Sequence, residues 1–347
     1  MRKLIRYEIK KNIGNRYILL ITLLLAAVIA FLSVEDWARF GTGRTGNRML
    51  SDPDQVDEQL AVFLDEQLQQ KTKLIQETRA EIRLEAARYG KEALKSGNLY
   101  QVRRNADIIR RYAETSTIVR NRIYGIDHFL TFPYGVLAAI LLTLVVNAGL
   151  FSEEYRKKTW IFLSTSKNGG LKTFLAKYIT GLGTSVFSYL LFQGIALGMI
   201  FLDQGLGGWK ESILAMDGFI ACPMNASVLQ FTLIETALQL TSVILFGAAA
   251  AAFSALSKNT RIAVLLTGIF LALNVGLTLL TKDSKTEWML LQIAEPVSML
   301  AGYRDLNLMS FPVQRISVLL VLWAIVTALL ITVAAFWAGP VRSRSNL

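Results

Sequence analysis

The chain has 347 residues, 53% of them hydrophobic and only 18% charged, and a mean hydropathy of +0.40. This balance excludes an ordinary soluble domain and is typical of a helical membrane protein with one polar insertion. The net charge of +11 would suggest nucleic-acid binding in a soluble protein, but the cations flank apolar segments without a nucleic-acid-binding motif, so we expect membrane lipid and no nucleic acid as their partner.

The N-terminal part of the chain predicts an interfacial helix followed by a membrane span. In residues 1–16, Ile5, Ile9 and Ile13 recur every fourth residue beside several cations, which indicates an amphipathic helix on the cytoplasmic membrane surface. The alternative is a disordered basic segment that only sets orientation. Residues 17–34 are apolar and long enough to cross about 30 Å of hydrocarbon. Because no convincing cleavage site follows, we expect a retained span rather than a signal peptide.

Residues 35–132 form the only large polar region, in which acids and bases almost balance. Apolar residues at mostly helical spacing predict a long helix that begins after Pro53. A turn at Gly97 and Asn98 leads to a second amphipathic run. We therefore expect an extracytoplasmic helical hairpin, with a break in its long first helix near Gly90.

The rest of the chain alternates between apolar spans and short polar connections. Residues 281–315 contain a short apolar piece that Glu295 and Pro296 stop, which predicts a re-entrant or interfacial helix. The predicted boundaries are a second span at 133–151, a cytoplasmic loop at 152–173, a third span at 174–202, an outer loop at 203–227, a fourth span at 228–253, a cytoplasmic loop at 254–261, a fifth span at 262–280, the outer loop at 281–315, a sixth span at 316–338 and a cytoplasmic tail at 339–347.

The predicted fold class is thus all-α: a polytopic membrane protein with six transmembrane helices and an extracytoplasmic helical hairpin between the first and second. The short inner segments are rich in cations and the short outer ones are nearly neutral, which places both termini in the cytoplasm. Gly194 and Gly198 in the third span have a spacing that permits close helix approach, either within the subunit or between two copies. We expect the small residues at the inner end of the fourth span to be buried in the bundle.

Catalytic chemistry has little support in the sequence. The single histidine, His128, and the single cysteine, Cys222, cannot form a usual metal cluster or an intrachain disulfide. The segment GGLKT resembles the end of a phosphate-binding loop, but Leu171 and Ser166 occupy positions where the Walker pattern needs glycine. We therefore expect no enzyme activity, and no metal, nucleotide or other cofactor bound by this chain.

Glu235 is the one acid placed well within an apolar span. Charged groups at membrane depth are costly, so it is a candidate substrate or coupling site. A structural ion pair or an exposed edge near the outer end of the span is the favoured alternative. Milder polar residues in the spans, Asn147, Gln193, Gln239 and Asn274, are expected to form hydrogen bonds between helices.

The cytoplasmic loop at 152–173 has a distinct chemical character. A short helix is possible from Glu153 to Ile161, with Glu153 and Glu154 at its N-terminal end and Lys157 later, which complements the helix dipole. Trp160 begins an apolar surface beside this helix. From the residues alone, two interpretations stay open: a loop resting on lipid headgroups with Trp160 as an anchor, or a contact surface for another protein.

Several motifs follow one another around the second span. After a basic start, MRKLIRYEIKKN, and a large outer insertion, the span ends in F-x-x-E (Phe151, Glu154), followed by a cationic stretch with Thr (156–159), an L-S/T-x-S segment (163–166) and L-x-x-K-Y (175–178). With six spans and a helical piece before the last one, the chain resembles ABC-2-type ABC transporter permeases. It departs from them at Lys158, where members often have Gly, and at Ser166, where they often have Pro.

The resemblance implies the permease subunit of an ATP-driven exporter in the bacterial cell membrane. In that family the loop after the second span docks as a coupling helix on a separate ATP-binding cassette ATPase subunit, which binds ATP and Mg²⁺. The expected ATPase contacts are Glu153, Glu154, Arg156, Lys157 and Trp160. A second permease copy or a paralogue would complete the pathway, and the exported substrate would be a peptide, a lipid or an amphipathic drug-like compound. The alternative is a non-transporting membrane sensor or mechanical transmitter whose extracytoplasmic helices bind a ligand.

Overall fold

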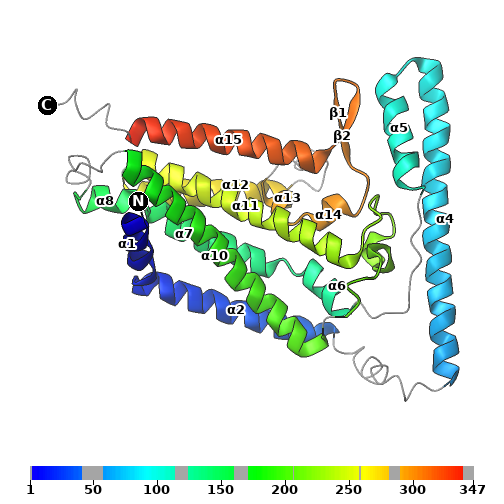
Figure 1. Ribbon diagram of the computed structural model, residues 1–347, viewed down its shortest axis with the longest axis horizontal. Helices are drawn as coiled ribbons and strands as arrows, with labels where there is room; N and C mark the ends of the chain where they lie inside the picture. The colour runs from blue at the N-terminus through cyan, green and yellow to red at the C-terminus, as the bar shows by residue number, and fades with distance from the viewer. Residues whose placement is uncertain are drawn as a thin grey trace.

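The computed structural model describes residues 2–40, 58–113, 124–159, 171–205, 207–257, 259–280 and 290–338, and the protein is mostly helical (Figure 1). The long helices are α1 (Arg2–Ile13), α2 (Arg16–Phe40), α4 (Glu58–Ser96), α5 (Leu99–Arg111), α7 (Tyr134–Gly149), α10 (Leu171–Gln204), α11 (Val228–Ser257), α12 (Thr260–Leu280) and α15 (Arg315–Ala338). The short elements are α6 (Tyr124–Thr131), α8 (Ser152–Arg156), α13 (Leu291–Ala294), α14 (Val297–Leu300), the 3₁₀ turns Ile213–Ala215 and Asp217–Phe219, and strands β1 (Asp305–Leu308) and β2 (Phe311–Gln314).

Five helical segments are long and apolar enough to cross a membrane: α2, the run from α6 to α8, α10, α11 and α15. Helix α12 is apolar over a shorter stretch, Thr260–Gly276. Their length and composition are those of a membrane-embedded helical protein. The count of six spans stays a prediction.

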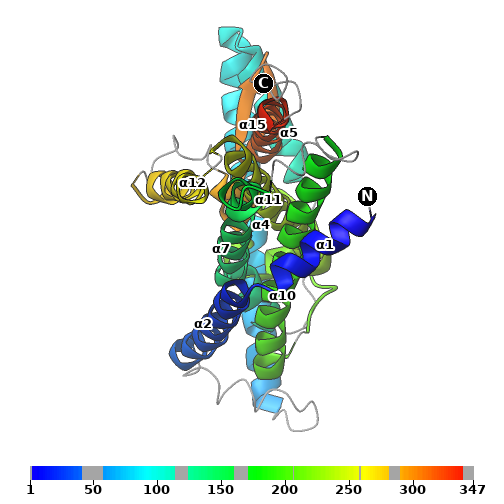
Figure 2. The same ribbon diagram turned by 90° about the vertical axis from the view of Figure 1, so that its left-hand side faces the viewer.

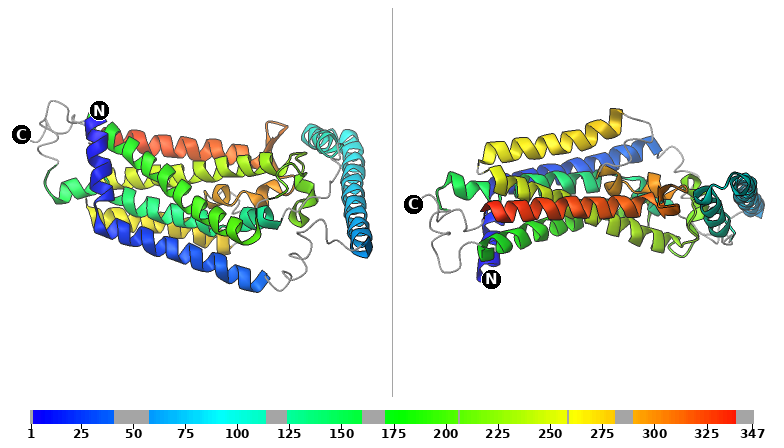
Figure 3. Two further views of the ribbon diagram at one scale, coloured as in Figure 1. Left: turned by 60° about the horizontal axis from the view of Figure 1, so that its bottom comes forward. Right: turned by 90° about the horizontal axis from the view of Figure 1, so that it is seen from above.

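The spans form a bundle with α7 and α11 at its centre and α2, α10, α12 and α15 around them (Figure 2). The central helices are the most buried. Within the apolar stretch of α11, 67% of the residues lie inside the protein, against 11% for α2 and 17% for α15. One end of the bundle carries α1 and α8, and the opposite end carries α4, α5 and the two strands (Figures 1 and 3). We call these the α8 end and the hairpin end.

Small residues let α11 lie against α7 and α10 near the α8 end. A Cβ atom on Gly247 would lie 2.7 Å from Thr143 Cγ2 and would also collide with the Ser185 hydroxyl. Asn147 Nδ2 donates to the Gly247 carbonyl at 3.2 Å and lies 3.4 Å from the Gly181 carbonyl. Burial of this small-residue stretch of α11 and interhelical bonding by Asn147 were both expected, and both are confirmed.

Gly194 and Gly198 behave differently. A Cβ atom at either position would meet no described atom within 4 Å. The spacing of these glycines therefore does not serve close packing against the described part of the same subunit, which leaves contact with a second copy as the open interpretation.

Helices α4 and α5 pack as a helical hairpin that turns at Gly97 and Asn98. Gly97 has φ 72°, and the Asn98 side chain caps α5 by accepting from the Gln101 backbone N at 3.1 Å. The break predicted near Gly90 is wrong, because α4 is continuous over 39 residues. A Cβ on Gly90 would lie 3.5 Å from Asn105 Cβ, so this glycine lies where α5 packs against α4 rather than at a helix end.

The segment before α15 contains structure that the all-α prediction missed. Strands β1 and β2 pair antiparallel in the register Asp305↔Gln314 to Leu308↔Phe311. Of the predicted re-entrant or interfacial piece, the described part forms α13, and α14 follows after Pro296. Leu290 and Ile293 are fully buried, so this piece packs inside the protein.

Candidate functional site

Helix α8 begins at Ser152, after a turn at Leu150 and Phe151 that follows α7. The backbone N–H groups of Phe151 and Ser152 donate to Ser254 Oγ on α11, at 3.0 and 3.1 Å, and the Ser152 hydroxyl donates to the Ala148 carbonyl at 2.9 Å. All the partners in these bonds are buried. These bonds join the start of α8 to both central helices, α7 and α11.

A tight backbone turn ends α8 after Arg156. The Thr159 N–H donates to the Glu154 carbonyl at 3.1 Å and the Lys158 N–H donates to the Tyr155 carbonyl at 3.2 Å, while Lys158 has φ 57°. This is a Schellman motif with lysine in the left-handed position that glycine usually takes. The described helix is shorter than the one predicted from Glu153 to residue 161, and residues 160–170 lie outside the described part of the chain.

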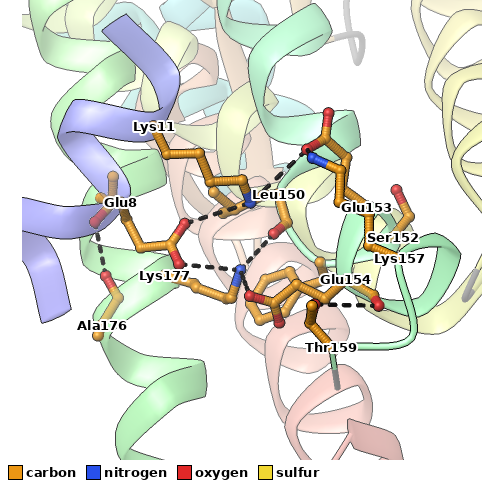
Figure 4. Close-up of polar contacts among 12 residues, drawn as sticks. Glu8, Lys11, Leu150, Ser152, Glu153, Glu154, Lys157, Thr159, Ala176 and Lys177 are labelled. Atoms are coloured by element: carbon orange, nitrogen blue, oxygen red, sulfur yellow. Dashed lines mark hydrogen bonds and ion pairs between the residues drawn. The ribbon is translucent and has the colours of Figure 1, made fainter. Parts of the chain in front are cut away.

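A buried lysine joins α8 to α10 (Figure 4). Lys177, on α10, is 1% exposed, and its Nζ lies 2.6 Å from Glu154 Oε1 and 3.4 Å from Glu8 Oε1. The same ammonium donates to the Leu150 carbonyl at 2.8 Å. With two carboxylates and a carbonyl around it, the buried charge is compensated, as a charge removed from water must be.

The same network extends to α1. Glu8 is 6% exposed, and Lys11 lies 3.8 Å from both Glu8 Oε2 and Glu153 Oε2. Lys157 lies 3.5 Å from Glu153 Oε2. We call Glu8, Lys11, Glu153, Glu154 and Lys177 the charge cluster; it joins α1, α8 and α10 at one point (Figure 4).

The five predicted ATPase contacts have different positions. The side chains of Glu153 and Glu154 point toward the charge cluster and are 22% and 15% exposed. Arg156 and Lys157 are exposed, and Trp160 lies outside the described residues. Whether any of them meets an ATPase stays a prediction.

Sequence reasoning missed the roles of Glu8 and Lys177. Lys177 lies inside the predicted third span, 174–202, where a cation is costly and indicates a buried partner. Glu8 is the one acid of the basic N-terminal helix. A search for the acid that could compensate Lys177 would have pointed to these two positions.

Glu235 lies in a second polar network deeper in the bundle, formed with glutamine and tyrosine side chains. It is 3% exposed and accepts from Gln239 Nε2 at 2.9 Å, so the predicted exposed edge is wrong. Gln239 Oε1 in turn accepts from Tyr189 Oη at 3.0 Å and from Gln193 Nε2 at 2.8 Å, which confirms interhelical bonds for both glutamines. The other Glu235 oxygen, Oε2, has no hydrogen-bond partner among the described residues, and no described cation pairs with the carboxyl group.

At the hairpin end, polar contacts hold α4 and α5 to the bundle. Arg79 is 1% exposed and donates to the Cys222 carbonyl at 3.0 Å, and Tyr112 Oη donates to the Ala221 carbonyl at 2.7 Å. Burial raises the pKa of Tyr112 to about 12. The hairpin is thus bound to the loop between α10 and α11.

A second set of contacts binds α5 to the segment before α15. Arg104 Nε lies 2.9 Å from Asp305 Oδ1, and Tyr303 Oη donates to Asp107 Oδ2 at 2.9 Å. Burial alone would raise the pKa of Asp107, but hydrogen bonds from Arg111 and Tyr303 outweigh it and hold that pKa below its usual value. The hairpin therefore has two independent attachments to the spans.

No family model, curated protein or solved structure matches the chain in the comparisons. The described residues also contain no group of three or more His, Cys, Asp or Glu side chains that could hold a metal ion. The features that bear on function are therefore the charge cluster, the buried polar network and the arrangement of the spans.

Proposed function

We propose that this chain is the permease subunit of an ATP-driven exporter of the ABC-2 type, with the α8 end in the cytoplasm. Exposed cations at the α8 end, among them Arg156, Lys157 and Arg261, support that orientation by the excess of positive charge in cytoplasmic segments. ATP and Mg²⁺ would be held by a separate ATPase subunit, and a second permease copy would complete the pathway.

The observation that carries this proposal is the attachment of α8 to several spans at once. Helix α8 follows α7 after a turn at Leu150 and Phe151, the Ser254 hydroxyl bonds it to α11, and Lys177 pairs with it from α10. A partner that pushes on α8 would therefore move three spans together. A loop that only rested on lipid headgroups would not need these buried bonds.

The ATPase contact in this proposal is the exposed side of α8. Arg156 and Lys157 are the cations on that side, and they fit an acidic groove on the ATPase, with Trp160 as a further candidate contact. Glu153 and Glu154 then act by fixing the orientation of α8 through Lys11 and Lys177. They position the contact rather than form most of it.

Affinity purification of the full chain from native membranes tests the proposal. We expect a protein with Walker motifs to co-purify in stoichiometric amount and to hydrolyse ATP. The double variant Arg156→Glu/Lys157→Glu should lose this protein while keeping the size-exclusion profile of the parent. The matched control is Arg88→Glu/Lys91→Glu on α4, at exposed positions of the opposite end, and it should keep the ATPase. If the α8 variant retains the ATPase and its activity, the proposed contact is wrong.

A sensor or mechanical transmitter is the second candidate, because of the attachment of α4 and α5. Two sets of polar bonds hold these helices to the loops that lead into α11 and α15. A ligand on the hairpin could shift these spans without any transport. Purification of the chain with no ATPase, together with a ligand-dependent change in α11 mobility, would favour the sensor over the exporter.

A further inference from the structure

The loop between β1 and β2 exposes apolar side chains at the hairpin end. Met309 is 92% exposed, and Leu308 and Phe311 are each 55% exposed. We call Leu308, Met309 and Phe311 the β tip. Single exposed apolar residues are common on proteins, but three at the end of one narrow projection form a concentrated apolar surface.

The turn at the β tip uses unfavourable residues for its geometry. Met309 has φ 49° and Ser310 has φ 69°, so both central positions lie in the left-handed region. Two-residue turns of this kind strongly prefer Asn and Gly, because side chains with a Cβ are strained there. A large apolar residue therefore takes a position in which Asn or Gly would be less strained.

The β tip is held in a fixed direction. Arg103 on α5 donates from Nη1 to the Ser310 carbonyl at 3.2 Å, and its guanidinium carbon lies 4.0 Å from the centre of the Phe311 ring. At the other end of the strand pair, away from the turn, Asp305 accepts from Tyr100 Oη at 2.8 Å and pairs with Arg104. These contacts fix the strand pair against α5.

The direction in which the β tip points decides what it meets. Figure 1 shows the strand pair projecting sideways beyond α15, at the hairpin end of that helix, rather than away from the bundle along the helix axes. β2 leads into α15 without a gap, since it ends at Gln314 and α15 begins at Arg315. A four-residue strand spans about 13 Å, so the tip stays near the level at which α15 leaves the apolar core.

The neighbouring surface of α15 is apolar and exposed. Val321 and Ile325 are 59% and 53% exposed on a helix that is only 17% buried over its apolar window. In a membrane-embedded protein such a surface faces lipid. The β tip is thus a lateral continuation of a lipid-facing helix, at the depth where headgroups begin.

We infer that the β tip inserts into the interfacial region of the lipid leaflet at the hairpin end. Leu308, Met309 and Phe311 would contact the upper acyl chains, and the exposed Arg103 guanidinium, which lies against Phe311, would reach the level of the lipid phosphates. The inserted tip is a third support for α5, from the membrane itself. This inference requires only that the spans lie in a bilayer, so it stands whether or not the chain is an exporter.

Fluorescence quenching in proteoliposomes of phosphatidylcholine and phosphatidylglycerol tests the inference. Met309→Cys is labelled with an environment-sensitive nitrobenzoxadiazole probe; the native Cys222 is fully buried, and unsubstituted protein serves as the labelling blank. We expect a blue-shifted emission, quenching by phosphatidylcholine with a nitroxide at acyl carbon 5, and at least threefold protection from aqueous iodide relative to the control. The control is Leu84→Cys, which is 72% exposed on the face of α4 opposite Ile75, Ala86 and Ala93.

Two results would overturn the inference. The first is equal iodide quenching at Met309 and Leu84, which would place the β tip in water. The second is efficient disulfide formation between two Met309→Cys chains together with absence of lipid quenching, which would make the tip a contact between copies. Labelling at Leu308 in a Leu308→Cys variant repeats the measurement if the Met309 variant does not fold.

Discussion

Lys177 Nζ on α10 and Glu154 Oε1 on α8 lie 2.6 Å apart in a place where the lysine is 1% exposed. This ion pair joins a membrane span to the short helix that follows another span. Its geometry turns the two acids of α8 inward and leaves the cations of that helix outside. The charge cluster is therefore a structural joint, and any partner would meet its positive side.

Replacing Lys177 by methionine should destabilise the protein strongly. The variant keeps the apolar stem but leaves Glu154 and Glu8 without their cation, and breaking a buried ion pair from one side costs about 3–5 kcal/mol. We expect a marked drop in the melting temperature in detergent, measured by tryptophan fluorescence. Adding Glu154→Gln and Glu8→Gln should recover much of the loss, and Lys157→Met at an exposed position should cost little. An unchanged melting temperature in Lys177→Met would contradict the joint.

Replacing Lys158 by glycine should stabilise the end of α8. Lys158 has φ 57° in the Schellman turn, and glycine reaches this conformation without strain, for a gain of about 1 kcal/mol. Hydrogen–deuterium exchange at Thr159, whose N–H bonds to the Glu154 carbonyl, should slow in Lys158→Gly. Lys157→Gly, one position earlier and outside the left-handed region, is the control and should not slow exchange.

Adding one methyl group at Gly247 should be costly, while the same change at Gly194 should not. The Gly247 Cβ would overlap Thr143, Asn147 and Ser185, and overpacking of this kind typically costs about 1–3 kcal/mol. Gly194→Ala meets no described atom within 4 Å and should keep the parent melting temperature in monodisperse detergent. If Gly194→Ala instead shifts the protein from dimer to monomer, this glycine lies in a contact between copies.

Glu235→Gln should fold at least as stably as the parent. The amide oxygen can still accept from Gln239, and a neutral amide cannot carry the buried charge that a carboxylate without a described cation partner would carry. Glu235→Leu should lose about 1–3 kcal/mol, because it leaves the Gln239 amide without an acceptor. Thermal unfolding of the two variants side by side measures the difference; equal stability of both would show that the bond to Gln239 contributes nothing.

Attachment of the hairpin should be insensitive to pH over a wide range. The pKa of Asp107 is lowered on folding, so its contribution is present above the unfolded value of about 3.9 and is lost as the pH falls through the folded value. The pKa of Tyr112 is raised to about 12, so its contribution is lost only as the pH rises toward that value. We expect the protection of the α5 backbone amides against hydrogen–deuterium exchange, corrected for back-exchange, to stay the same from pH 5 to pH 9. Asp107→Asn should exchange faster throughout this range, and protection that changes near pH 7 would contradict the assignment.

Hydropathy predicts the apolar helices because every backbone group in a membrane must be satisfied within a helix. Local turn chemistry equally predicts the bend at Gly97 and Asn98, where a left-handed glycine and a capping asparagine act over a few residues. Features that depend on contacts between distant parts of the chain are harder to predict from the sequence. Gly90 reads as a helix breaker in isolation, but α5 packs on it and the helix continues.

The charge cluster and the strand pair show the same limit. Lys177 and Glu8 are 169 positions apart, and only the folded bundle brings them within 3.4 Å. The strands contain Asn307 and Pro312 and a turn with Met309, none of which is typical of a strand or a two-residue turn. Arg103 and Arg104 on α5 contact the turn at Ser310 and Asp305 of β1, and these distant contacts cannot be read from the strand sequence itself.

The uninterrupted length of α4 also sets how closely this protein can be packed with its neighbours. A helix of 39 residues is about 58 Å long, and α4 crosses the end of the bundle instead of continuing its axis (Figures 1 and 3). Helix α4 consequently extends sideways past the spans at the hairpin end (Figure 1). If the spans lie in a bilayer as proposed, a neighbouring protein that approaches the hairpin end along the direction of α4 would meet this helix before it met the spans.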